Sequence, residues 1–166
     1  MGDEKHILGF TNAELARIDP VSLNLRVAIG IPQLADLDIA MYQAIVDRYA
    51  YDIRLRVEQD EHHFHNNPAA WRNDINFFNL GIVCDYIDCD LGIQYREDQR
   101  ELKSVRYTEP SDLFLNGLID TKRGTCGNMA VLHQAIGWRL GWPVSLACAD
   151  SQPVPAVRQR ASTAQR

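Results

Sequence analysis

A long run of helically spaced apolar residues constrains this chain more than any other feature. From Leu37 to Val57 apolar side chains recur every three or four positions, and Asp36 and Asp38 stand near the start, where negative charge suits a helix N-terminus. The pattern continues as far as a cluster of histidines, and Pro68 ends it. We therefore expect one long helix here, or two helices joined by a kink.

Further helices and one strand are expected to follow. Apolar spacing predicts a helical segment over 73–92, with Gly92 as a natural terminator. Ser111 and Asp112 are expected to cap a short apolar helix. Apolar residues at helical spacing also predict a helix over 125–140. The run "VSLACA" after it predicts a short buried strand. The expected fold class is α+β and mostly α.

The composition fits one globular domain. A chain of 166 residues, 46% hydrophobic and 23% charged, is long enough to bury a core. Beyond residue 149 its character changes, because residues 150–166 include no aromatic residue and cannot bury enough surface to offset their ordering entropy. We expect a single domain over 1–149, helical over 1–110 and with a cysteine-bearing core over 111–149, followed by a disordered tail over 150–166.

Charge and cysteine content narrow the class of protein. The formal net charge of -5 argues against a nucleic-acid partner, because phosphate binding needs a basic face. The N-terminus is charged, so neither a secretory signal nor a membrane anchor is expected. A cytoplasmic chain with reduced thiols follows. The four cysteines are then expected to serve packing or chemistry rather than disulfides; they are Cys84, Cys89, Cys126 and Cys148.

The stretch "RGTCGN" is the strongest candidate for chemistry. It places Cys126 at the start of the 125–140 helix, and a helix N-terminus favours the reactive thiolate. Gly124, Thr125 and Gly127 form the expected oxyanion-binding turn, in which glycines allow close approach of a substrate and first-turn N–H groups stabilise negative charge. The alternative is that Cys126 is a small buried hydrophobic residue.

The residues around Cys126 carry a family resemblance. Arg-Gly-Thr-Cys-Gly, the apolar helix, Arg-Leu-Gly-Trp-Pro and the following strand resemble the core of the transglutaminase-like superfamily. The resemblance is close over 111–149 and looser over 40–110, where "DINFFNLGIVCDYIDCDLGIQY" resembles the bacterial branch. It implies a helix packed on an antiparallel sheet, and a cysteine acyl transferase or amide hydrolase. In such an enzyme Cys126 attacks an amide carbonyl of a protein or peptide substrate, and no cofactor is needed.

The family's histidine and aspartate have no counterpart here. That family carries the histidine on a strand after the cysteine helix and the aspartate on the next strand, yet no histidine or aspartate occurs beyond Asp150. The triad is therefore expected to be incomplete, the sheet largely missing, and activity absent or severely impaired. A reading-frame change near Gln152, a truncation and a naturally degenerate domain are the alternatives that explain this departure.

Other histidines and cysteines are expected to have no catalytic role. His133 lies seven residues after Cys126, a separation of roughly 10 Å along a helix and too long for a hydrogen bond. The "HHFH" cluster over 62–65 suits a solvated tip, and no metal site is expected there, because such a site needs three or four converging ligands. Cys84 and Cys89 are expected in the core.

Two functions remain open on the sequence alone. The first is an incomplete transglutaminase-like cysteine enzyme with Cys126 as its nucleophile. The second is a non-catalytic helical protein-interaction module. In either case, an unpaired edge on the "VSLACA" strand predicts self-association.

Overall fold

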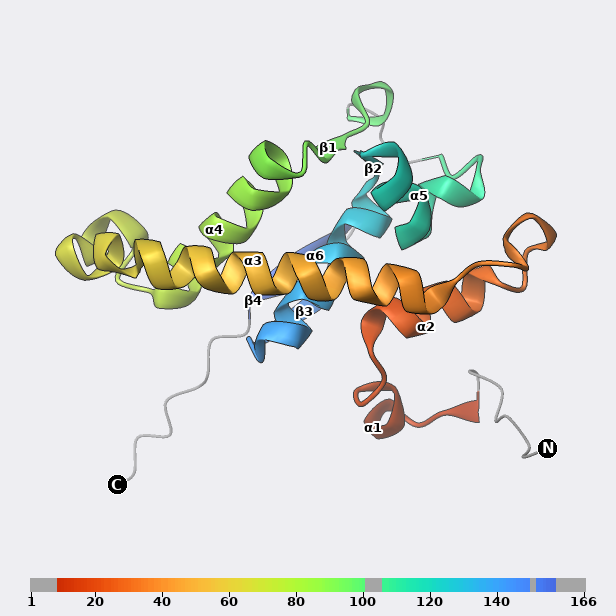
Figure 1. The fold of residues 1–166 in the computed structure, drawn as a ribbon, viewed down its shortest axis with the longest axis horizontal. Helices are drawn as coiled ribbons and strands as arrows, with labels where there is room; N and C mark the ends of the chain where they lie inside the picture. Colours follow the sequence, from red (N-terminus) through yellow and green to blue (C-terminus); the bar gives the residue numbers. More distant parts are fainter. Residues whose placement is uncertain (1–8, 101–105, 150–151, 158–166) are drawn as a thin grey trace.

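The structure, a computed structural model, describes residues 9–100, 106–149 and 152–157 of the chain. The long helix α3 crosses the molecule. Helices α4 and α5 lie on one side of it, α2 lies on the other with α1 beyond it, and α6 crosses behind it (Figure 1). The helices are α1 (Asn12–Leu15), α2 (Pro20–Ala28), α3 (Ile39–Asn66), α4 (Ile75–Asp85), α5 (Leu115–Thr121) and α6 (Cys126–Leu140). The strands are β1 (Gln94–Tyr95), β2 (Arg123–Gly124), β3 (Val144–Ala149) and β4 (Gln152–Val157). The fold is α+β and mostly α, as the sequence predicts.

Helix α3 is continuous over 28 residues, so of the two alternatives that the sequence leaves open, one long helix or two joined by a kink, the structure has the first. At its start, the Asp38 carboxylate accepts a hydrogen bond from the N–H of Met41 at 3.0 Å. This bond satisfies one of the donors that a helix N-terminus leaves without an intrahelical partner. The helix ends at Asn66, shortly before Pro68, whose ring cannot continue it.

The core lies where α2, α3, α4 and α6 meet. Leu25, Ile53 and Phe78 are fully buried on the first three of these helices. On α6 the predicted stripe is confirmed, because Leu132 and Ile136 are wholly inaccessible to solvent. Helix α6 contacts α2, α3 and α5, so it links the helices on both sides of the core.

A polar junction ties the C-terminal turn of α6 to α2 and α3. The largely buried Arg139 donates hydrogen bonds to Asp19 at 2.8 Å and to Asp47 at 2.5 Å. Gln43 donates a further bond to Asp19 at 2.9 Å. Burial by itself raises the pKa of Asp19, but the bonds from Arg139 and Gln43 outweigh it and lower that pKa below its usual value.

Helix α4 runs into a π-helical turn, η4 (Tyr86–Asp90), and the segment ends at Gly92, whose φ is +64°. The apolar spacing over 73–92 assumes a regular α-helix and places Cys89 on its buried face. The wider π turn rotates the residues that follow, so Cys89 no longer faces the core. Cys84 also lies outside the core, because the face of α4 that contains Phe78 packs against the core and Cys84 is on another face. Both cysteines are exposed, so the prediction that they are core residues is wrong.

The cap predicted for α5 is also wrong. The helix begins at Leu115, and its N–H is accepted by the side-chain oxygen of Asn24 on α2 at 2.9 Å. Ser111 and Asp112 lie about one turn earlier, in the 3₁₀ turn η6 (Pro110–Asp112). A side chain from another helix therefore satisfies the N-terminus that the sequence assigns to a local cap.

The strands form two separate two-stranded sheets. β1 and β2 pair in parallel, with Gln94 opposite Arg123 and Tyr95 opposite Gly124. β3 and β4 pair antiparallel over their whole length. Gly137 of α6 permits close packing against β3, since a Cβ at this position would lie 2.5 Å from a methyl group of Val144.

The sheet of β3 and β4 differs from the sequence prediction in two ways. Strand β4 lies inside the segment predicted as a disordered tail, and pairing with it satisfies one edge of β3. Proline is tolerated in β4 because β4 is an edge strand. Residues 150–151 and 158–166 of the predicted tail lie outside the described residues. Strand β3 is not buried throughout, because Leu146 is 40% exposed.

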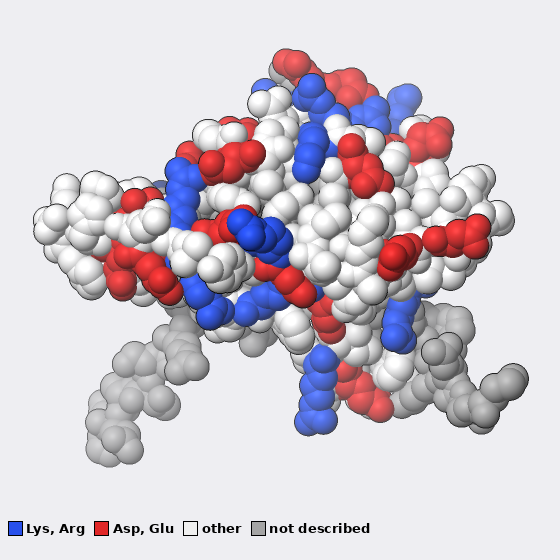
Figure 2. All heavy atoms as spheres, viewed as in Figure 1, with Lys and Arg blue, Asp and Glu red and all other residues white. Residues whose placement is uncertain are grey.

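The surface carries both signs of charge. Figure 2 shows lysine and arginine side chains interspersed with aspartate and glutamate along α3 and over the rest of that face. Among the described residues, no helix has the length and apolar character needed to cross a membrane.

Candidate functional site

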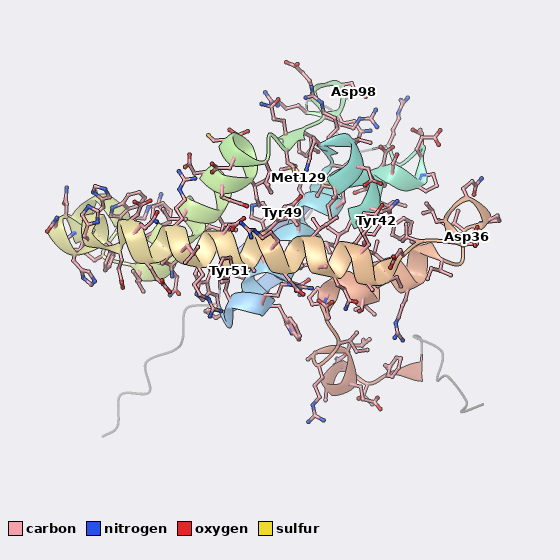
Figure 3. The ribbon with its side chains drawn as sticks, viewed as in Figure 1. Asp36, Tyr42, Tyr49, Tyr51, Asp98 and Met129 are labelled. Carbon is pink, nitrogen blue, oxygen red and sulfur yellow. The ribbon has the colours of Figure 1, made fainter. Side chains whose placement is uncertain are left out.

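The chain reaches Cys126 through a segment that α3 fixes at two points. The hydroxyl of Tyr42 donates to Asp120 at 2.8 Å, and the ammonium group of Lys122 donates to the hydroxyl of Tyr49 at 3.3 Å. Figure 3 shows Tyr42 and Tyr49 along α3 below α5 and the first turns of α6. Burial and the Asp120 carboxylate raise the pKa of Tyr42 to about 12, so this hydroxyl stays a donor.

The parallel pair of β1 and β2 places Tyr95 beside the turn that precedes Cys126. The N–H of Arg96 donates to the carbonyl of Gly124 at 2.8 Å, which extends the pairing by one bond. A Cβ at position 124 would lie 2.2 Å from the side chain of Met129 and 2.8 Å from that of Leu118. Gly124 is therefore required for packing, and its backbone holds β1 against the start of α6.

Buried hydrogen bonds fix the first turn of α6. Thr125 is fully buried, and its hydroxyl donates to the carbonyl of Asp112 at 2.7 Å. Its N–H donates to the side-chain oxygen of Asn128 at 2.8 Å, and the Asn128 amide donates to the carbonyl of Ser111 at 3.1 Å. These bonds attach α6 to η6, so the sequence-predicted Thr125 positions the turn from inside.

The Asp112 carboxylate holds the loop that contains Tyr107, which lies beside Cys126. Its side chain is 3% exposed and accepts bonds from the Arg96 guanidinium at 2.5 Å, the Thr108 N–H at 3.2 Å and the Glu109 N–H at 3.3 Å. Asp98, which is largely exposed, binds the other side of the same guanidinium. The segment that contains Tyr107 is thus held by a buried charge.

Cys126 is half-buried, and its sulfur lies 3.3 Å from the hydroxyl oxygen of Tyr107. Partial burial and the contact with Cys126 raise the pKa of Tyr107 to about 12. Burial, with a smaller contribution from Cys126, also raises the pKa of Tyr95. Both phenols are therefore protonated at neutral pH, and they can donate a hydrogen bond to a thiolate but cannot accept its proton.

Backbone donors add to these hydroxyls. The first i to i−4 bond of α6 runs from the N–H of Met129 to the carbonyl of Thr125, so the preceding N–H groups have no intrahelical acceptor. Gly127 lies among them, and a Cβ there would be 3.3 Å from the Tyr107 hydroxyl. The arrangement around Cys126 can therefore stabilise negative charge on a sulfur or on a nearby oxygen.

The described residues provide no imidazole at Cys126. The ring of His133 is engaged further along α6, where Nδ1 bonds the Met129 carbonyl at 2.8 Å and Nε2 lies 3.8 Å from the sulfur of Cys84. His133 and Cys126 are thus far apart on α6, as helix geometry predicts, and each has its own partner: Cys84 for His133 and Tyr107 for Cys126. Tyr95 and Tyr107 are site residues that the sequence does not single out, and Asp112 is predicted from the sequence only as a helix cap.

The histidine cluster forms no metal site among the described residues, which contain no group of three histidine, cysteine or acidic side chains close enough to bind a metal. His62 bonds the Gln59 carbonyl at 2.8 Å, and the largely exposed His65 lies 3.5 Å from Glu61. These contacts are local to the last turns of α3.

Comparison with protein-family models, curated proteins and solved structures finds no match to this chain. The resemblance to the transglutaminase-like superfamily therefore stays a prediction from the residues around Cys126.

Proposed function

We propose that the chain is a transglutaminase-like cysteine acyl transferase or amide hydrolase scaffold in which Cys126 is the nucleophile and the general base is missing. One observation carries the proposal. Cys126 is the first residue of α6, and its half-buried sulfur lies 3.3 Å from a tyrosine hydroxyl that stays protonated at neutral pH. A helix N-terminus and a hydrogen-bond donor both favour the thiolate over the thiol.

In the proposed reaction, the Cys126 thiolate attacks the carbonyl carbon of a substrate amide. The C–N bond breaks, the amine leaves with a proton taken from water, and the acyl group stays on the sulfur as an acyl-enzyme. The oxyanion accepts hydrogen bonds from first-turn N–H groups of α6, and the Tyr107 hydroxyl lies 3.3 Å from the attacking sulfur. Transfer and hydrolysis then differ only in whether an amine or water takes the acyl group. Without a general base both steps are slower, by a factor on the order of 10² to 10⁴.

A protein or peptide is the proposed substrate. An open polar hollow with about 830 Å³ of empty space adjoins the segment before Cys126, and Arg96, Asp98 and Arg123 are among its lining residues. Backbone amides and charged side chains of a peptide suit such a surface. The proposal places the protein in the cytoplasm, where thiols stay reduced, and the described cysteines Cys84, Cys89 and Cys126 are free.

A specific observation favours a second candidate, the non-catalytic interaction module. An apolar groove with about 720 Å³ of empty space runs between α2, α6 and β3. Its lining includes three exposed apolar side chains, Val27 (51% exposed), Trp138 (46%) and Leu146 (40%). Exposed apolar residues gathered in one groove are typical of a protein-binding surface.

An acylation experiment tests the first candidate. The full chain is mixed with p-nitrophenyl acetate, and the acetylated residue is identified by intact mass and peptide mapping. We expect a stable acetyl group on Cys126, because the missing base slows deacylation, and we expect none at that position in Cys126→Ser. The matched control is Cys89→Ser, which removes an exposed thiol and should leave Cys126 acetylation unchanged. Acetylation of Cys126 no faster than that of Cys89 would overturn the proposal and favour the interaction module.

A further inference from the structure

We propose that Cys84 of α4 and His133 of α6 form a second thiol site, separate from Cys126, that accepts the acyl group of a small aliphatic thioester. The Cys84 sulfur lies 3.8 Å from Nε2 of His133. Among the described residues, Cys84 is the cysteine in contact with an imidazole. Thiol and base within reach of each other are the two parts that nucleophilic catalysis by cysteine requires.

The orientation of the His133 ring suits a base. Its Nδ1–H donates to the carbonyl of Met129 at 2.8 Å, one turn earlier in α6, so in the neutral ring Nε2 carries the lone pair. Burial lowers the pKa of His133, which keeps the ring neutral at pH 7. The lone pair therefore faces the S–H of Cys84, and the Met129 carbonyl fixes the ring in this position.

The reactivity of the Cys84 thiol at neutral pH depends on His133. The residue is exposed as a whole, but its sulfur faces the half-buried His133, and partial burial raises the pKa of the Cys84 thiol. Free thiolate is then scarce at neutral pH. Rapid acylation of Cys84 consequently needs proton transfer to His133 during the attack.

A pocket beside His133 indicates the class of ligand. It is a narrow pocket that admits about one water-sized or methyl-sized group, and Leu80, Val83 and Trp142 give it apolar walls. The side-chain oxygen of Asn79, which also lines it, is buried and has no hydrogen-bond partner among the described residues. The methyl end of a short acyl group is about the largest group that fits between these walls, beside the Asn79 oxygen.

The step is a transthioesterification. The Cys84 sulfur attacks the thioester carbonyl carbon while its proton passes to Nε2 of His133. The new bond joins Sγ to the acyl carbon, the bond from that carbon to the leaving sulfur breaks, and the imidazolium returns the proton to the leaving thiolate. The products are S-acyl-Cys84 and a free thiol, with no change of oxidation state.

Cys89 provides an internal control on the same helical segment. It is exposed like Cys84, but its sulfur lies 3.4 Å from Asp85. The hydrogen bond to the Asp85 carboxylate and its charge raise the pKa of the Cys89 thiol. Cys89 therefore has an anionic neighbour where Cys84 has a neutral imidazole.

The experiment uses the full chain carrying Cys126→Ser, so that its outcome is independent of the proposed function. The probe is S-acetyl-N-acetylcysteamine, which holds a short acyl group and one amide N–H, and peptide mapping follows acetylation of each thiol with time. We expect Cys84 to react at least about tenfold faster than Cys89. His133→Gln should remove most of that advantage and leave the Cys89 rate unchanged.

Two results would overturn the proposal. One is a Cys84 rate equal to or below that of Cys89 in the chain with His133 intact, a comparison that does not depend on how any histidine variant folds. The other is an unchanged Cys84 rate in His133→Gln whose circular dichroism and thermal unfolding match those of the parent.

Discussion

Helix α6 presents two thiol environments that divide between them what a cysteine enzyme normally combines. At its first residue, Cys126 has a helix N-terminus and a tyrosine hydroxyl but no imidazole among the described residues. Two turns later, His133 provides an imidazole to Cys84, which lies near the C-terminal end of α4. One thiol has donors that stabilise an anion, and the other has a base.

Helix geometry explains why the two environments do not merge. Seven residues along α6 correspond to roughly 10 Å, so His133 cannot reach Cys126 from the same helix. A base for Cys126 must come from another element, as it does from a strand in the transglutaminase-like family. The two thiols can therefore be altered separately, by variants that affect one of them alone.

The largest expected effect comes from Asp112→Ala, which should lower the free energy of unfolding by about 2 kcal/mol because it removes a buried acceptor shared by donors of Arg96, Thr108 and Glu109. It should also change the reactivity of Cys126, through the loop that carries Tyr107, while Cys84 in the folded protein keeps its rate. Urea unfolding and site-resolved alkylation measure the two effects.

The matched control for that variant is Asp98→Ala, which removes the exposed carboxylate on the same Arg96 guanidinium. Exposed ion pairs contribute little, so the loss should stay below about 1 kcal/mol. Equal losses in the two variants would contradict the organising role of the buried Asp112 carboxylate.

A smaller effect is expected from Tyr107→Phe. This change removes one hydroxyl at 3.3 Å from the Cys126 sulfur and should slow alkylation of Cys126 by about three- to tenfold, the equivalent of one hydrogen bond. Cys84 should be unaffected, since its partner is His133. Tyr51→Phe, on the exposed side of α3, is the control. An unchanged Cys126 rate in Tyr107→Phe would mean that the hydroxyl does not stabilise the thiolate.

The smallest effect concerns pH. Burial lowers the pKa of His133 from its ordinary 6.5, so the unfolded chain binds a proton more readily than the folded one. The resulting stability is present above pH 6.5 and is lost as pH falls from there toward the folded-state pKa. We expect His133→Gln to lose less stability than the parent between pH 7 and pH 5.5 in urea titrations. Parallel pH profiles would contradict a neutral buried ring.

Local signals in the sequence predict much of the fold. The spacing of apolar residues predicts α3 and α6, and Gly141 ends α6 with φ +71°, as a C-terminal glycine should. The π turn η4 is the local exception. It breaks the regular 3.6-residue period, so the exposure of Cys89 cannot be derived from that period.

The candidate site depends on long-range contacts, and the sequence predicts only part of it. "RGTCGN" predicts the helix start and its turn, because glycines and a cap residue act locally. Tyr107 reaches Cys126 across 19 residues, and the pair of Cys84 and His133 spans 49. Neither contact leaves a periodic signal, since each depends on how α4, α6 and the 106–112 segment pack.

The central claim is that Cys126 is presented as a nucleophile, and site-resolved alkylation of the unmodified chain tests it most directly. Limiting iodoacetamide at pH 7, followed by peptide mapping, compares Cys126 with Cys84, Cys89 and Cys148 in one sample. We expect Cys126 to be alkylated at least about tenfold faster than Cys89, because thiolate is favoured at a helix N-terminus. A Cys126 rate equal to or below that of Cys89 would contradict it.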